Sequence, residues 1–301
     1  MRSSSTKFWA AALGAGLVLL GLQAIGTGPA AAATLPFGTV RAISKQSPPN
    51  TQTKKSFSVE CDQGERVTGG GAFTVGGVHA VITEMRPIQD LTAKDSFQVT
   101  AEADQFGIVG VWSFQVFAFC AKPPASAAIE VIEHPNLPRT GGTDQAFAPC
   151  PGGKLLIGAG GKIDNAGGQM DLGMFTNSSG TLATGSSAFA KPDADGYTGT
   201  YKVTGYSVCA KPNSLLDDFK QQRVSFTAPA GQTSQVRVPP GCPSGSALSG
   251  LAGATVLPGT HLQQIRSNTA NGPANLATFG AQATITPPEQ WTIDTTMFCV
   301  R

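Results

Sequence analysis

The sequence predicts an all-β chain of three tandem, disulfide-braced, β-sandwich-like repeats with about six strands each. The first observation is a repeated frame in which a cysteine precedes a glycine-rich segment, and it begins at Cys61, Cys150 and Cys242. The second is composition, because 37 glycines and 41% hydrophobic residues, with little helix-forming sequence, fit strands joined by tight turns.

Each opening cysteine has a closing partner at a nearly constant distance. The separations are 59, 59 and 57 residues, and the pairs use all six cysteines. An even number of cysteines in an exported chain indicates disulfides. We therefore predict that each repeat closes on itself, through Cys61–Cys120, Cys150–Cys209 and Cys242–Cys299.

The expected strands follow the same order in every repeat. A first strand and a turn rich in Pro, Asn, Thr and Gly come before a second strand that ends on the opening cysteine. Phe57 and Val59 share the face of Cys61, and we expect Val236 and Val238 to share that of Cys242. The glycine cluster then opens a third strand, where absent side chains indicate a bulge or a close approach of backbones. Middle strands are expected at 78–83, 97–101, 170–175, 186–189, 261–265 and 277–283, and a short helix at 213–220.

The closing strand carries an aromatic residue eight positions before its cysteine, at Trp112, Tyr201 and Trp291. An even offset places each aromatic side chain on the cysteine's face of the strand. We expect these three residues to be buried, and to pack near the disulfides.

Two arrangements of the repeats stay open. Repeats of about 90 residues, at 34–122, 123–211 and 212–301, are long enough for separate domains. The alternative is a pseudo-threefold β-prism with a shared core. The Pro-containing junctions after Lys122 and Lys211 resemble linkers, so we favour separate domains.

Residues 1–33 have the three parts of a secretory signal peptide: Arg2 and Lys7, an apolar run, and small residues up to Ala33. Cleavage would leave 19 basic and 19 acidic residues, because 21 − 2 = 19. A neutral chain without basic clusters argues against nucleic-acid or anionic-membrane partners. We expect a secreted, extracellular monomer with no membrane span after cleavage.

The C-x-x-G-x-x-x-x-G-G-G opening at Cys61, with an aromatic-x-C type of closing, resembles a repeat of exported proteins from high-GC Gram-positive bacteria. Members of that group mostly lack an assigned activity, and the likeness covers residues 34–301. The triplicated C-x-x-G-x-x-x-x-G pattern is also similar to the β-prism of the vitelline-membrane outer-layer type. Neither resemblance implies catalytic residues.

Known catalytic and metal-binding patterns are missing from the sequence. The three histidines, at 79, 134 and 261, have no predicted partners, and neither H-E-x-x-H nor G-x-S-x-G occurs. Asp193-Ala194-Asp195-Gly196 resembles the start of a calcium loop but lacks the later acidic ligand. We therefore expect no enzyme, no cofactor and no metal.

Two functions stay open. The first is a secreted, non-catalytic binding protein that recognises a cell-surface glycan or another surface ligand through its repeat loops, where linked sites gain avidity. The second is a structural or assembly component of the cell envelope or of a secreted protein complex. Ligand contacts are expected in the loops between middle strands, 87–94, 177–185 and 267–275. The candidate residues are Arg86, Asp90, Lys94, Asn177, Ser178, Ser179, Arg266, Asn268 and Asn271.

Overall fold

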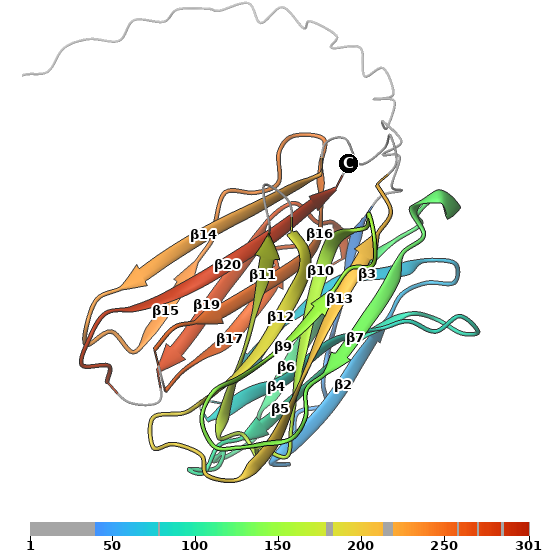
Figure 1. Ribbon diagram of the computed structural model, residues 1–301. Coiled ribbons are helices and arrows are strands. Elements are labelled where there is room, and N and C mark those ends of the chain that lie inside the picture. Colours follow the sequence, from blue (N-terminus) through green and yellow to red (C-terminus); the bar gives the residue numbers. More distant parts are fainter. Residues whose placement is uncertain are drawn as a thin grey trace, which may run out of the picture. The chain divides into compact units, whose positions relative to one another are not determined.

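All three repeats contain six principal strands in the same chain order, as predicted (Figure 1). The structure is a computed structural model. It describes residues 40–77, 79–178, 183–212, 219–257, 259–269, 271–283 and 286–300. The predicted signal peptide lies outside these residues. So does most of the expected helix at 213–220, and Lys220 begins a strand.

The strands have the following bounds. Repeat 1 contains β1 (Arg41–Gln46), β2 (Lys54–Glu60), β3 (Arg66–Val75), β4 (Ala80–Ile88), β5 (Ser96–Ala103) and β6 (Ser113–Ala121). Repeat 2 contains β7 (Glu130–Pro135), β9 (Asp144–Pro149), β10 (Leu155–Asp164), β11 (Met170–Ser178), β12 (Ala183–Pro192) and β13 (Thr200–Ala210). Repeat 3 contains β14 (Lys220–Ala228), β15 (Ser234–Arg237), β16 (Ala247–Thr255), β17 (Thr260–Ser267), β19 (Ala277–Ala283) and β20 (Trp291–Val300). Shorter elements are a 3-10 turn at Ala125–Ala127 and the two-residue strands β8 (Arg139–Thr140) and β18 (Gly272–Pro273).

Within a repeat the strands form two antiparallel groups of three. The first, sixth and third strands pair in the order β1-β6-β3, and the second, fifth and fourth pair as β2-β5-β4. Repeats 2 and 3 show the same two groups, as β7-β13-β10 with β9-β12-β11 and β14-β20-β16 with β15-β19-β17. The predicted six-strand, sandwich-like unit is therefore confirmed.

Disulfides join the two groups of each repeat at one end. Cys61 follows β2 and bonds to Cys120 in β6, and Cys150–Cys209 and Cys242–Cys299 are the corresponding bonds. All three predicted pairs are confirmed. In repeat 3, however, Val236 and Val238 are each 54% exposed, so they do not share an inward face with Cys242. The strand ends at Arg237 before two prolines, and the alternation does not continue to the cysteine.

The three aromatic residues close the opposite end of each repeat. Trp112, Tyr201 and Trp291 are buried as predicted, but not beside the disulfides. Eight residues of extended chain span about 26 Å, at about 3.3 Å per residue. The Trp112 Nε1 donates to the Gln52 carbonyl at 2.7 Å, and the corresponding donors on Tyr201 and Trp291 bond to the carbonyls of Gly142 and Gln232. Each aromatic side chain thus anchors the turn after the first strand.

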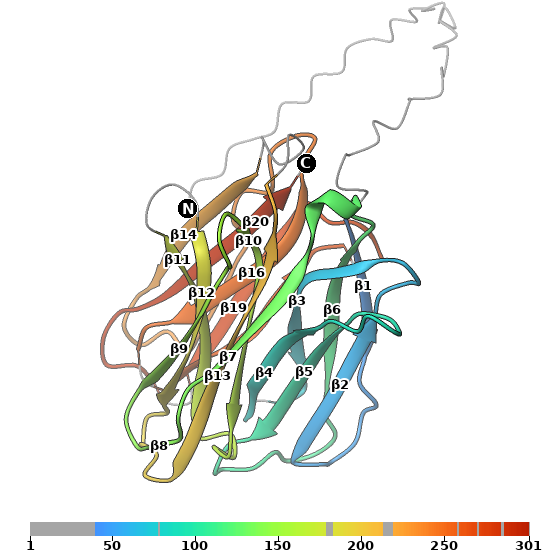
Figure 2. The same cartoon turned by 45° about the vertical axis from the view of Figure 1, so that its right-hand side comes forward.

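The sheets continue from one repeat into the next, so the expectation of separate domains is wrong. β4 of repeat 1 pairs with β10 of repeat 2, and β17 of repeat 3 pairs with β3 of repeat 1. Figure 2 shows the first of these sheets, with β2, β5 and β4 beside β13 and β7. Residues 34–301 accordingly form one compact unit. Pairing across the junctions satisfies strand edges that a separate repeat would expose.

Three glycines at corresponding positions meet where the repeats converge. Gly69, Gly158 and Gly250 each follow a register shift in the third strand. A Cβ on Gly69 would lie 2.7 Å from Gly250 Cα, one on Gly250 would lie 2.6 Å from Gly158 Cα, and one on Gly158 would lie 2.0 Å from the Thr68 oxygen. These contacts form a closed cycle around a pseudo-threefold axis. The glycine cluster therefore permits a close approach of backbones, and the closed arrangement is the one found.

Candidate functional site

The third junction between repeats contains a pocket instead of paired strands. Symmetry would pair β11 of repeat 2 with β16 of repeat 3, but among the described residues these neighbouring strands belong to two separate three-stranded sheets. A pocket of about 690 Å³ lies at this junction, within the range of small-molecule sites. We call it the interrepeat pocket. Its lining residues are Thr143, Gln145, Met174, Phe175, Thr176, Phe189 and Lys191 of repeat 2, and Arg223, Ser225, Ala254, Thr255, Val256, Asp294, Thr295 and Thr296 of repeat 3.

Small residues explain why the third junction is open. In the other two junctions, Gln264 pairs with Phe73 and Glu84 pairs with Lys162. The corresponding residues in the third are Gly173 and Ala254. Ala254, Phe73 and Lys162 each follow the opening cysteine of their repeat by 12 residues, and Gly173 and Glu84 each follow theirs by 23. Large side chains cover two junctions, and their absence leaves the third uncovered.

Two phenylalanines form the apolar wall of the interrepeat pocket. The rings of Phe175 and Phe189 lie 5.7 Å apart at 48°, and both are half-buried. Phe189 lies over Gly173, where a Cβ would be 2.2 Å from the ring. Glycine at this position therefore sets the place of the ring.

The opposite wall is polar and carries one charge of each sign. Arg223 Nη2 donates to the Thr176 carbonyl at 2.6 Å and also to the Thr176 hydroxyl. Asp294 Oδ1 accepts from the Ser225 hydroxyl. In the described part of the chain, Arg223 Nε and Nη1 and Asp294 Oδ2 have no protein partner. These atoms are available to hydrogen-bond a ligand.

Lys191 borders the pocket but is committed to the protein. Its ammonium donates to the carbonyls of Thr255, Leu257 and Thr260 and to the Thr255 hydroxyl, and it lies 3.9 Å from Asp171 Oδ2. Burial is the main cause that lowers the pKa of Lys191 to about 8. This lysine connects repeat 2 to the turn between β16 and β17.

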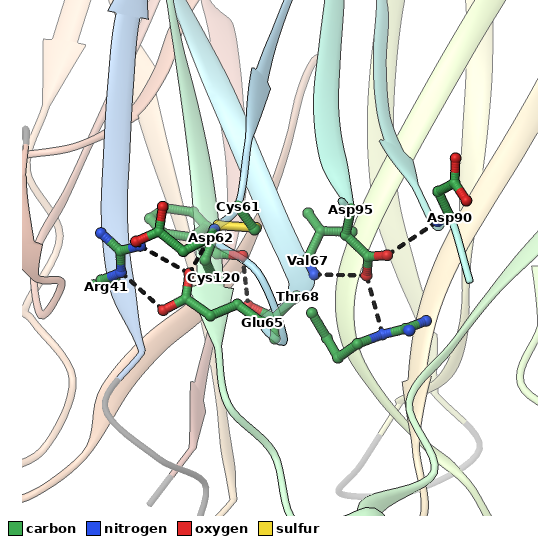
Figure 3. The surroundings of a disulfide bond; sticks show 11 residues. Arg41, Cys61, Asp62, Glu65, Val67, Thr68, Asp90, Asp95 and Cys120 are labelled. Atoms are coloured by element: carbon green, nitrogen blue, oxygen red, sulfur yellow. Dashed lines mark hydrogen bonds and ion pairs between the residues drawn. A yellow bond between two sulfur atoms is a disulfide. The ribbon is translucent and has the colours of Figure 1, made fainter. Parts of the chain in front are cut away.

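The first predicted loop is held by its own hydrogen bonds (Figure 3). Asp90 Oδ1 accepts from Thr92 N, Thr92 Oγ1 and Ala93 N, and the first of these bonds is the largest cause that lowers the Asp90 pKa. Asp95 accepts from the backbone N–H groups of Asp90 and Val67. Lys94 is exposed. The loop lies at the disulfide end, where Cys61 N donates to the Asp95 carbonyl.

Two predicted arginines fill the closed junctions. Arg86 lies 2.8 Å from Glu84 in the second junction, and Arg266 lies over the Phe73 ring at 5.0 Å in the first. In the repeat frame Arg86 corresponds to Phe175, since each follows its opening cysteine by 25 residues. These arginines occupy space that the third junction leaves open.

The other predicted residues are dispersed. Asn177 donates to Ser187 Oγ at 2.6 Å, the same hydroxyl that Gln145 of the pocket contacts, so it borders the interrepeat pocket. Ser178 ends β11, and Ser179 lies outside the described residues. Asn268 accepts from Thr278, and Asn271 is exposed beside β18, which pairs with β1. A ligand role for the three loops stays a prediction.

Other groups with chemical potential have protein partners or are inaccessible. His79 Nδ1 lies 2.8 Å from Asp104 Oδ2. His261 is buried, and burial is the main cause that lowers its pKa to about 4, which keeps the ring neutral. Cys61, Glu65 and Cys120 bring three ligand types together, but the two sulfurs are joined and Glu65 pairs with Arg41 (Figure 3).

Comparisons with protein-family models and with curated proteins find no match to this chain. The resemblance to exported repeat proteins therefore stays a prediction. In the part of the chain that the structure describes, no helix combines the length and apolar character needed to cross a membrane.

Sequence reasoning did not find the interrepeat pocket. Its residues come from six strands of two repeats, and neither Phe175 nor Phe189 belongs to a known motif. Alignment of the repeats contains one usable signal, because Gly173 and Ala254 are small where the other junctions have large residues.

Proposed function

We propose that the protein is an exported, non-catalytic binding protein that holds a neutral cell-surface glycan in the interrepeat pocket. The observation that carries the proposal is the composition of this pocket: two phenyl rings face a wall of hydroxyl, amide, guanidinium and carboxylate groups. Sugar rings combine apolar C–H faces with hydroxyl edges, so they match such a pair of walls. The opposite charges of Arg223 and Asp294 compensate each other, which favours a neutral ligand.

Absence of catalysis is part of the proposal. Asp294 is the one carboxylate among the described residues that line the pocket. Glycoside hydrolysis commonly needs a pair of carboxylates, one on each side of the bond. Export is supported by the disulfides, which are typical of oxidising compartments, together with the predicted signal segment.

The test is a glycan array followed by calorimetry with the best-bound oligosaccharide. Phe175→Ala removes one ring and Arg223→Gln removes the guanidinium. Each should weaken binding by about tenfold or more, the equivalent of about 1.4 kcal/mol. Matched controls outside the pocket are Phe106→Ala, at a 60% exposed ring, and Arg237→Gln on the edge strand β15. Equal loss of binding in the controls, or no loss in the pocket variants, would refute the proposed site.

An assembly role is the second candidate, and a different surface favours it. The turn between β5 and β6 exposes Phe106 at 60%, Val109 at 96% and Val111 at 61%. Clusters of exposed apolar side chains are typical of protein contacts. If this role is correct, serine at these three positions should abolish co-purification with an envelope or secreted protein, whereas the pocket variants should retain it.

A further inference from the structure

The turn between β12 and β13 holds a buried carboxylate without a partner. Asp193 is 6% exposed, and neither of its side-chain oxygens has a hydrogen bond in the described residues. The backbone is held in place, because Asp193 N donates to the Gln169 carbonyl and Gly196 N to the Asp193 carbonyl. A buried polar group without a partner is costly, so this carboxylate requires an explanation.

The groups around Asp193 supply oxygen atoms and no positive charge. Asp195 follows two residues later, and its Oδ1 accepts from Gln105 Nε2 at 2.8 Å, across the boundary with repeat 1. Asp171 also acts on Asp193 through its charge, and its Oδ2 is a second buried oxygen without a hydrogen bond. The nearby Lys191 directs its ammonium to repeat 3 and to Asp171. Burial first, and then Asp195, raise the pKa of Asp193 to about 7.

We propose that Asp193 and Asp195 bind a calcium ion at the boundary between repeats 1 and 2, with the side-chain oxygen of Gln105 as a further ligand. A divalent cation would satisfy the unpartnered oxygens and remove the repulsion between the two carboxylates. Calcium accepts carboxylate, amide, carbonyl and water oxygens in irregular geometry, whereas magnesium demands a near-ideal octahedron. The Gln105 amide presents oxygen in place of nitrogen after a half-turn of its terminal bond. The site is independent of the interrepeat pocket.

Calcium titration of the chelator-treated protein tests this proposal. Calorimetry should show one ion bound with a Kd of about 0.1 to 1 mM, as in extracellular calcium modules. Excess calcium should also raise Tm, because a ligand that binds only the folded state stabilises it. Magnesium should bind more weakly.

Variants separate a cation site from a structural role of the carboxylate. D193N and D195N should weaken calcium binding about tenfold or more, and D164N, whose parent residue pairs with Lys162 at 2.7 Å, should not. In chelator, D193N should melt at or above the wild-type temperature, because it removes carboxylate repulsion. A purely structural Asp193 would instead give a lower Tm with or without calcium. No calcium uptake by the wild type, or equal uptake by D193N, would overturn the proposal.

Discussion

Individual residues decide which junction stays open. The closed junctions contain Phe73 with Gln264 and Lys162 with Glu84, and in the open one the corresponding residues are Ala254 and Gly173. Gly173 has a second effect, since a side chain there would displace the Phe189 ring. Substitution at a few positions can therefore turn a structural contact into a binding pocket without changing the strand order.

The Asp193 carboxyl should make stability depend on pH when no cation is bound. Its pKa is raised from 3.8 to about 7, so the folded state binds this proton more tightly than the unfolded chain does. The stabilisation is complete below about pH 4 and is lost as the pH rises toward about 7. Asp171, Asp195 and Lys191 face the same region, and their effects largely cancel when D193N is the reference. In chelator, wild-type Tm should fall relative to D193N over this range; a constant difference would contradict the assignment.

The glycines at the axis should be intolerant of substitution. Gly158→Ala would place a Cβ 2.0 Å from the Thr68 oxygen, and backbone atoms cannot yield as a flexible side chain can. We expect a loss of about 3 kcal/mol in the free energy of unfolding, as for severe overpacking. Gly152→Ala is the matched control, because nothing lies within 4 Å of its Cβ. Similar denaturation midpoints for both variants would argue against close backbone contact at the axis.

At the scale of elements, every repeat is fastened at both ends of its two strand groups. A disulfide closes one end, and an aromatic donor bonds to a turn carbonyl at the other. The loop after the fourth strand also contacts the opening cysteine in each repeat, through the carbonyls of Asp95, Thr184 and Asn275. Sequence divergence between repeats therefore leaves this frame unchanged.

Tyr201→Phe tests the aromatic fastening with little change in volume. The variant deletes the bond from the hydroxyl to the Gly142 carbonyl, which is 2.7 Å long and half-buried. Chemical denaturation should show a loss of about 1 kcal/mol. Tyr197→Phe, which deletes an exposed bond to the Asn165 carbonyl, should cost less. Equal costs would mean that the Tyr201 bond does not hold the turn.

Periodicity and spacing in the sequence predicted the strands, the disulfides and the burial of Trp112, Tyr201 and Trp291, because these depend on local alternation and on a repeated distance. The even offset predicted the correct face for the aromatics but not their position along it, since eight extended residues cross the whole strand. The pairing of β4 with β10 was not predictable, because one strand edge can accept many partners. The candidate pocket depends on that same long-range pairing, and on its failure at one junction.

On the scale of the whole molecule, each repeat contributes one strand group to each of two neighbouring junctions. A single repeat would therefore expose the edges of its third and fourth strands together with the glycine-rich centre. We expect residues 123–211 alone, with Cys150–Cys209 formed, to give poorly dispersed amide resonances. The intact protein should unfold in one calorimetric transition. A well-dispersed spectrum for the single repeat would show that the repeats fold independently.

The central claim is that the open third junction is the binding site, and Ala254→Phe tests it most directly. This change introduces the residue that Phe73 supplies in the first junction and should fill the interrepeat pocket from the β16 side. Wild-type protein and the variant would be applied to the same glycan array, with Tm measured for both. We predict that the wild type binds at least one neutral glycan, that the variant loses this binding, and that Tm stays within a few degrees. Binding that survives Ala254→Phe, or a wild type that binds no glycan, would contradict the account.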